Sequence, residues 1–308
     1  MTTNPVLTRQ LVAAGYTHRE VAGLTRDGQL VRLRRGAYAR PGPADGPEDR
    51  TGFDEAERHL MLVAATLPLV SADAVVSHRS AAALHGLPTF SGLDQVALTR
   101  SSGSGKRRGY LHLHVAPLPA DEVEVRDGVR VTTLERTVVD LARHLPHAEA
   151  VAVGDAALRS GAAPDELATL LQRSRGRPGV AAARRVLGFL DARSESVGES
   201  FSRVTLHQLG LAPSSLQFDV LGPSGRVVAR ADFCWEEERT LGEFDGRAKY
   251  GRLLRPGQSP ADALWAEKQR EDLLRDLGWQ VVRWVWADLA REQLLAERIH
   301  RAWQRGSR

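Results

Sequence analysis

The 308-residue sequence has little cysteine, since Cys234 is its single thiol. One thiol forms no disulfide within a chain and rules out a zinc finger, so we expect a fold without crosslinks, suited to a reducing compartment. Long apolar runs are missing too. The longest uncharged apolar run, residues 60–72, contains Pro68 and falls short of the about 20 apolar residues of a membrane span. Without a basic segment followed by an apolar one at the start, the sequence predicts a cytoplasmic protein with no membrane partner.

Lysine is also scarce. Of the 42 basic side chains, only Lys106, Lys249 and Lys268 are lysines. The 38 acidic residues leave a net charge of +4, so the distribution of charge is more informative than its sum. A hydrophobic content of 42% excludes a disordered chain, and the length accommodates two or three domains of about 100 to 200 residues.

The N-terminal residues follow the order helix, helix, hairpin. Apolar residues at helical spacing predict a first helix that stops before Gly15. Thr17 and Glu20 form a capping box that begins a second helix. Residues 30–40 have the pattern of two short strands around a tight turn. This order predicts a winged helix-turn-helix domain over residues 1–45.

Residues 26–40, from the end of the second helix through the hairpin, contain five arginines against the lone Asp27. In winged helices the second helix enters the major groove and the wing contacts phosphates. The candidate DNA-binding residues are His18, Arg19, Arg26, Arg32, Arg34 and Arg35. The alternative is a helical hairpin with a solvated arginine-rich edge that binds a protein partner.

A linker rich in Pro, Gly and acidic residues at 41–52 precedes a second domain. Residues 53–145 combine helical and strand patterns and predict an α/β domain. Two of its strands are expected to flank a mobile basic loop at 101–109. Asp127 and Gly128 lie between two apolar runs, which predicts a β-hairpin.

Four histidines of this domain invite a metal-site interpretation. His112 and His114 share one face of a predicted strand but alternate with apolar residues, and no carboxylate or cysteine lies close in sequence to complete a metal-ligand set. We therefore expect outward-facing polar side chains on a half-buried strand. His78 and His85 are expected to be structural.

Two segments of this domain carry a family resemblance. Residues 77–87 read SHRSAAALHGL and residues 131–142 read VTTLERTVVDLA. Together with the N-terminal module, they resemble the AbiEi-type antitoxins of type IV toxin-antitoxin systems. The resemblance covers roughly the first half of the chain. It implies a winged-helix DNA-binding repressor joined to a domain that counteracts a nucleotidyltransferase toxin.

Residues 146–193 predict a helical basic connector. Its arginines cluster around residues 176–179, which contain Gly, Pro and Gly at close spacing. They form either a solvated helix face or an extension of the DNA-binding surface.

Residues 194–308 predict a mixed sheet flanked by helices. The turn at 236–239 sets a register in which Asp232 faces Glu243 on the next strand. Because side chains alternate along a strand, Asp245 falls on the same face as Glu243. Three carboxylates are therefore expected on one patch, where they need a shared proton, an arginine partner or a divalent cation.

Asp232 followed by the segment Glu243-Phe244-Asp245-Gly246 resembles the restriction-endonuclease-like PD-(D/E)XK fold, especially its Vsr-like branch. The resemblance covers about residues 194–290 and implies metal-dependent phosphodiester hydrolysis with Mg²⁺ or Mn²⁺ as cofactor. The sequence departs from the motif at Asp245, where the family has a lysine.

The resemblance assigns catalytic roles to the residues Asp232, Glu243, Asp245, Lys249, Glu199 and Lys268. Asp232, Glu243 and Glu199 would hold the metal. Lys249 or Lys268 would replace the missing lysine, although Lys268 is also spaced to pair with Glu271 or Asp272 on its helix.

The sequence as a whole thus predicts an α+β multidomain protein with a winged helix, an antitoxin-like α/β domain and a restriction-endonuclease-like domain. One functional hypothesis is a DNA-binding antitoxin or transcriptional regulator that carries a metal-dependent endonuclease-like domain. The alternative is a non-catalytic repressor or antitoxin whose nuclease-like domain only binds DNA or a partner.

Overall fold

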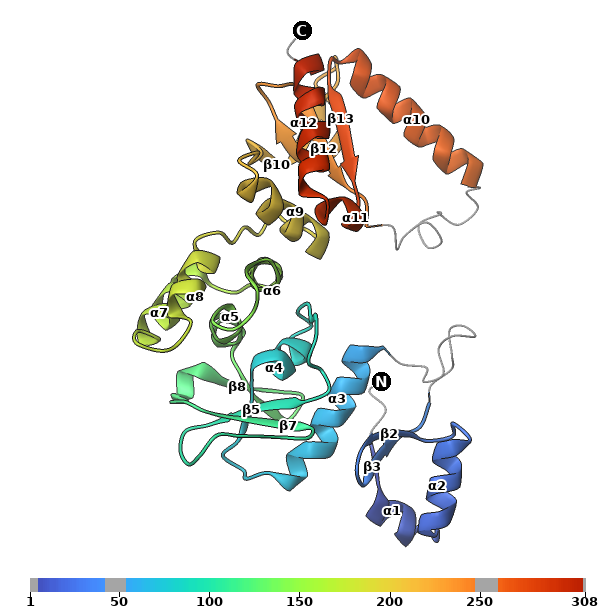
Figure 1. Ribbon diagram of the computed structural model, residues 1–308, viewed down its shortest axis with the longest axis vertical. Coiled ribbons are helices and arrows are strands. Elements are labelled where there is room, and N and C mark those ends of the chain that lie inside the picture. The colour runs from blue at the N-terminus through green and yellow to red at the C-terminus, as the bar shows by residue number, and fades with distance from the viewer. Residues whose placement is uncertain (1–4, 42–53, 247–259, 307–308) are drawn as a thin grey trace. The chain divides into compact units, whose positions relative to one another are not determined.

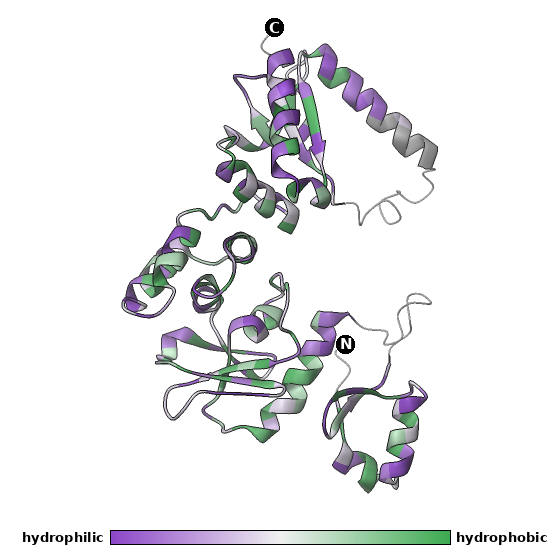
Figure 2. Cartoon of the chain, viewed as in Figure 1, coloured by the Kyte–Doolittle hydropathy of each residue, from purple (hydrophilic) through white to green (hydrophobic). Residues whose placement is uncertain are grey.

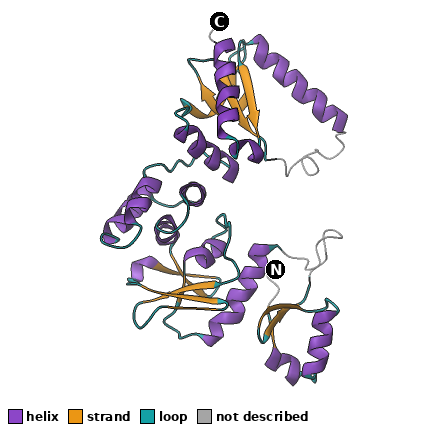
Figure 3. Cartoon of the chain, viewed as in Figure 1, coloured by secondary structure: helices purple, strands orange, loops and turns teal. Residues whose placement is uncertain are grey.

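The structure is a computed structural model that describes residues 5–41, 54–246 and 260–306 (Figure 1). The chain divides into two compact units, Met1–His144 with Ala162–Arg184 and Leu145–Gly161 with Arg185–Arg308. Both units combine helices with sheets (Figure 3), which confirms the mixed α+β class. No helix among the described residues is long and apolar enough to cross a membrane.

The N-terminal module begins the first unit. Its elements are β1 (Val6–Leu7), α1 (Thr8–Ala13), α2 (His18–Arg26), β2 (Val31–Arg34) and β3 (Ala37–Ala39). The predicted capping box is present: the Glu20 N–H donates to the Thr17 hydroxyl at 3.2 Å, and the Thr17 N–H donates to the Glu20 carboxylate at 2.7 Å. Leu11, Val21 and Leu30 form the small core that fixes α1 against α2 and the hairpin.

The strand β1 was not predicted, because two residues are too few to show an alternating pattern. It pairs with β3, with Val6 opposite Tyr38, so the sheet has the order β1-β3-β2. The predicted hairpin is therefore two strands of a three-stranded sheet that also includes the residues before α1.

The central domain is built on a six-stranded sheet of order β6-β7-β5-β4-β9-β8. Its strands are β4 (Val75–Val76), β5 (Val96–Arg100), β6 (Lys106–Arg108), β7 (Leu111–Val115), β8 (Val123–Arg126) and β9 (Val129–Thr132). The predicted hairpin between β8 and β9 is present, and Asp127 and Gly128 both adopt positive φ at its turn.

The prediction of a mobile basic loop over residues 101–109 is wrong in part. Lys106–Arg108 form β6, which pairs antiparallel with β7 and places Lys106 opposite Leu113. Three consecutive basic residues are compatible with a strand here because β6 is the edge of the sheet and all three side chains are exposed.

Helices cover this sheet. After the N-terminal module, the first unit contains the helices α3 (Glu55–Thr66), α4 (His78–Leu84), α5 (Leu134–Ala142) and α7 (Pro164–Arg173), while α8 (Val180–Leu187) contains the point at which the two units divide. Met61 of α3 and Ala81 of α4 pack into the core formed with the strands. Thr133 caps α5 as predicted, accepting a hydrogen bond from the Arg136 N–H. The Glu135 carboxylate accepts from the Ala163 N–H at 3.0 Å and ties α5 to the start of α7.

The second unit contains a four-stranded sheet of order β10-β11-β12-β13. Its elements are α6 (His147–Arg159), α9 (Val197–Gln208), β10 (Ser215–Leu221), β11 (Val227–Trp235), β12 (Thr240–Phe244), α10 (Pro260–Asp276), β13 (Gln280–Trp284), α11 (Trp286–Leu289) and α12 (Glu292–Gly306). β12 and β13 run parallel and the other pairs antiparallel, as the mixed-sheet prediction requires.

Aromatic residues fill the core of this unit. Hydrophilic and hydrophobic residues alternate along α12 (Figure 2), and its apolar side chains, including Leu295 and Ile299, pack against Trp284. Gly242 of β12 lies beneath that indole: a Cβ atom added there would stand 2.6 Å from Trp284. The indole of Trp284 can pack against β12 only because position 242 has no side chain.

Gly242→Ala should therefore lower the free energy of unfolding of this unit by about 1 to 3 kcal/mol, because the added methyl group overpacks the core. All six tryptophans lie within residues 235–303, so tryptophan fluorescence during urea unfolding reports on this unit. The matched control is Gly246→Ala, whose Cβ would stand at an ordinary 3.7 Å from Phe244 and should change stability by less than about 0.5 kcal/mol. Equal stability of the two variants would contradict the packing argument.

Candidate functional site

Cationic side chains gather on one exposed face of α2. His18, Arg19 and Arg26 are all exposed, whereas Val21 on the other side of the helix is 2% exposed and enters the core. His18, Ala22 and Arg26 follow one another at four-residue spacing and so share a line along the helix. We call the surface of these exposed residues the α2 face. It presents arginines where the second helix of a winged helix meets the major groove.

The hairpin of β2 and β3 presents Arg32 and Arg35 to solvent. Arg34 behaves differently. Its guanidinium donates to the carbonyl oxygens of Arg35 and Ala65 and lies 5.3 Å from the centroid of the Tyr110 ring. Arg34 therefore joins the hairpin to the central domain, while Arg32 and Arg35 are free to meet phosphates. A run of arginines in the sequence does not reveal this division of roles.

Strands β11 and β12 pair in the predicted register. Phe233 lies opposite Gly242 at the end of the paired segment, and Asp232 precedes Phe233 on β11 while Glu243 follows Gly242 on β12. The Asp232 Oδ2 atom accepts a hydrogen bond from the Phe244 N–H at 2.8 Å. Two of the predicted carboxylates thus belong to one patch on neighbouring strands.

Arginines hold the Glu243 carboxylate from both sides. One oxygen forms an ion pair with Arg270 of α10, and the other accepts from Nε of Arg283 on β13 at 2.9 Å. Arg283 is also the neighbour of Glu243 in the parallel pairing of β12 with β13. The sequence alone does not reveal this contact, because only the order of the strands brings Arg283 beside Glu243.

Glu199 of α9 is also engaged. It is 8% exposed, and its Oε2 atom accepts hydrogen bonds from the Glu195 N–H and from the side-chain amide of Gln217, both at 2.8 Å. These contacts fix the turn before α9. Among the described residues no group of three or more His, Cys, Asp or Glu side chains is arranged to hold a metal ion.

The remaining candidates for the catalytic site are Asp245, Lys268 and Lys249. The Asp245 N–H donates to the Trp284 carbonyl oxygen at 2.8 Å, which extends the pairing of β12 with β13. Lys268 is exposed on α10, with Nζ 6.0 Å from the centroid of the Trp265 ring. Lys249 lies outside the described residues.

Asp232 is the most perturbed carboxyl group of this patch. Burial raises its pKa to about 7. The hydrogen bond from the Phe244 N–H opposes this shift, and the negative charges of Glu199, Glu243 and Glu195 add to it. Near neutral pH, Asp232 therefore exchanges between its neutral and charged forms.

This shift makes stability depend on pH. Native Asp232 holds a proton that the unfolded chain releases between about pH 4 and pH 7, so the free energy of unfolding should fall as the pH rises through this window, by up to about 1.4 kcal/mol per pH unit. Asp232→Asn removes this contribution. Urea unfolding of both proteins at several pH values between 4.5 and 7.5 isolates it as the difference between them, and a difference that does not vary with pH would refute the assignment.

Comparisons with known proteins match both modules of the first half. Residues 4–41 match a family described as "Transcriptional regulator, AbiEi antitoxin", and residues 73–189 match the "AbiEi antitoxin C-terminal domain". These matches confirm the antitoxin resemblance. They lend no support to the nuclease resemblance of residues 194–308.

Similar proteins occur in Mycobacterium tuberculosis. Two proteins described as uncharacterized, MT2308 and Rv2248 from two strains, are each 31% identical to this chain over 287 residues, which cover 92% of this chain and 96% of theirs. The crystal structure of the RV2827C protein from the same species covers 71% of this chain and 84% of its own, with 16% identity and a TM-score of 0.39. By its two matched regions, residues 4–41 and 73–189, the chain belongs to the AbiEi antitoxin family of type IV toxin-antitoxin systems.

Proposed function

We propose that this protein is a transcriptional repressor whose winged helix binds DNA through the α2 face and the hairpin. The observation that carries the proposal is the exposure of Arg19 and Arg26 on the helix that winged-helix proteins insert into the major groove. Arg32 and Arg35 extend the cationic surface onto the hairpin, where phosphates are contacted. Membership of a transcriptional-regulator family supports the same role.

We further propose that the central domain acts as an antitoxin toward a nucleotidyltransferase-type toxin. The support is the family match over residues 73–189. In this arrangement one chain represses transcription through its first module and counteracts the toxin through its second.

The wing contributes phosphate contacts in this proposal, so Arg32→Ala combined with Arg35→Ala should weaken binding to all duplexes alike. Loss of two phosphate contacts should reduce the slope of log K against log salt by about 2. The measurement is fluorescence anisotropy from 50 to 200 mM salt, using duplexes that the wild-type protein has selected from a random pool. The matched control is Arg126→Ala, an exposed arginine on β8, which should leave affinity and slope unchanged. An unaltered slope in the double variant would contradict the assignment of Arg32 and Arg35 to phosphate contacts.

Substitutions on the α2 face should change a different quantity, the discrimination between DNA sequences. Arg19→Ala combined with Arg26→Ala should reduce the ratio of affinities for the selected duplex and a scrambled duplex, because each lost bidentate base contact removes about 1 to 3 kcal/mol of discrimination. A uniform loss on both duplexes would reassign these arginines to the phosphate backbone.

The second candidate function is phosphodiester hydrolysis by residues 194–308 with Mg²⁺ or Mn²⁺. It is favoured by the positions of Asp232 and Glu243 on paired neighbouring strands and by the negative charges of Glu199 and Glu243, which raise the pKa of Asp232. The described donor set does not fit a divalent cation, because both oxygens of Glu243 are paired with arginines. Non-catalytic binding of DNA or a partner is therefore the better-supported role of this domain.

A nicking assay separates these two roles. Supercoiled plasmid incubated with the protein and Mg²⁺ or Mn²⁺ should stay intact, because Arg270 and Arg283 take the place that a cation would occupy at Glu243. The control is Asp232→Asn combined with Glu243→Gln. Metal-dependent nicking that this double variant abolishes would establish hydrolysis, whereas nicking that survives it would reveal a contaminating nuclease.

A further inference from the structure

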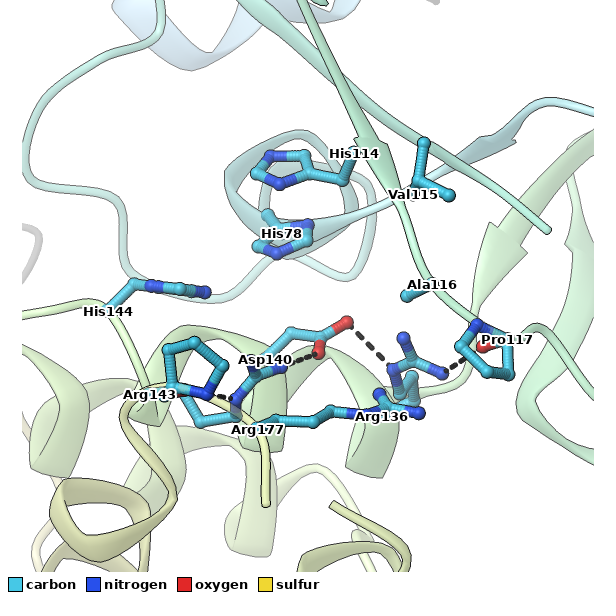
Figure 4. Close-up of a pocket in the computed structure, with 11 residues that line it drawn as sticks. His78, His114, Val115, Ala116, Pro117, Arg136, Asp140, Arg143, His144 and Arg177 are labelled. Carbon is cyan, nitrogen blue, oxygen red and sulfur yellow. Dashed lines mark hydrogen bonds and ion pairs between the residues drawn. The ribbon is translucent and has the colours of Figure 1, made fainter. Parts of the chain in front are cut away.

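A cationic pocket lies within the antitoxin domain. It has a volume of about 240 Å³ and is formed by the start of α4, the end of β7 with the residues after it, α5 with the residues after it, and the segment between α7 and α8 (Figure 4). The charged and imidazole side chains that line it are His78, His114, Arg136, Asp140, Arg143, His144 and Arg177. None of these residues belongs to the DNA-binding surface proposed above.

Three guanidinium groups and one carboxylate are among the side chains that line the pocket. Asp140 is held between Nε of Arg136 at 2.8 Å and Nη1 of Arg143 at 3.3 Å, so its charge is neutralised within the wall (Figure 4). Arg177 adds a further positive charge to the lining. The wall therefore carries an excess of positive charge that an anion would balance.

Arg136 supplies the second observation. Its side chain is 2% exposed and bonds to Asp140, Glu122 and the carbonyl oxygen of Pro117, yet its Nη2 atom is buried with no hydrogen-bond acceptor among the described residues. A buried guanidinium N–H without an acceptor is costly, by about 1 to 3 kcal/mol, and the residue that carries it is one of those that line the pocket.

Imidazole rings complete the lining. The rings of His78 and His114 stack with centroids 3.8 Å apart. Burial, together with neighbouring histidines, lowers the pKa of both side chains to about 3, so each is neutral near pH 7 and retains one N–H. His78 also has a positive φ of 50°, a conformation that non-glycine residues rarely adopt. Neutral N–H groups beside arginines suit an acceptor-rich anion.

We propose that this pocket binds a phosphate monoester, with the phosphate oxygens accepting hydrogen bonds from Arg136 and Arg177. A phosphate dianion offers several acceptor oxygens and forms its strongest hydrogen bonds with guanidinium groups. The cavity is smaller than the about 300 to 1,000 Å³ of pockets for drug-sized ligands, so it accommodates a phosphate and a short part of its ester. The ester group is either that of a small alcohol or that of a mononucleotide.

Isothermal titration calorimetry on the full chain at constant ionic strength tests this proposal with three probes: inorganic phosphate, glycerol 1-phosphate and AMP. We expect one site per chain. Tighter binding of AMP than of glycerol 1-phosphate identifies a nucleotide as the source of the phosphate, and equal or weaker binding identifies a small phosphate ester. Failure of all three probes to bind at millimolar concentration would overturn the proposal.

Two variants locate the binding site. Arg136→Lys keeps a charge for Asp140 and Glu122 but removes the unpartnered nitrogen, and Arg177→Gln removes a lining charge without touching that buried network. Each should weaken phosphate binding by about tenfold or more. Arg177→Gln keeps the test decisive if Arg136→Lys fails to fold.

The matched control is Arg175→Gln, an exposed arginine two residues from Arg177 that does not line the pocket. It should bind phosphate as the wild type does. Equal weakening by Arg175→Gln and Arg177→Gln would show general attraction to a basic surface and overturn the proposal. The pocket variants should keep wild-type affinity for the selected duplex. Loss of phosphate binding and loss of DNA binding can therefore be told apart, and either proposal can be refuted without the other.

Discussion

Pairing with arginine is the constraint that makes the buried charges of this chain tolerable. In the antitoxin domain Arg136 holds both Glu122 and Asp140. In the second unit Arg203 holds Asp155, which is 0% exposed, at 2.8 Å. Removing one partner of such a pair leaves an uncompensated buried charge and costs about 3 to 5 kcal/mol. The abundance of arginine and the scarcity of lysine suit this use, since the planar guanidinium bridges two acceptors at once.

Arginine pairing also determines how the carboxylate patch of Asp232 and Glu243 in the C-terminal domain is stabilised. Glu243 receives Arg270 and Arg283, whereas Asp232 accepts a backbone N–H and has a raised pKa. A patch of like charges needs arginine, a proton or a cation, and here arginine and a proton already meet that need. The patch is thus compatible with a structural or binding role in a family of DNA-binding antitoxins.

Local signals in the sequence predicted much of this structure. The capping box at Thr17, the Asp127-Gly128 turn and the register of β11 against β12 all follow from a few neighbouring residues. Features that depend on distant segments were missed. The strand β1 and the partners of Arg34 exist only through contacts across the fold. The pocket residues were separately judged structural or passed over, because no spacing rule brings His78 and Arg177 together.

The edge strand β6 has a consequence for self-association. An open edge offers unpaired N–H and C=O groups to any strand that approaches, and sheets of this kind are prone to add a strand from another molecule. Here the edge is made of Lys106, Arg107 and Arg108, all exposed. A second copy would have to bring the same three charges alongside them. Mutual repulsion therefore opposes the addition of a second copy's β6 at this edge.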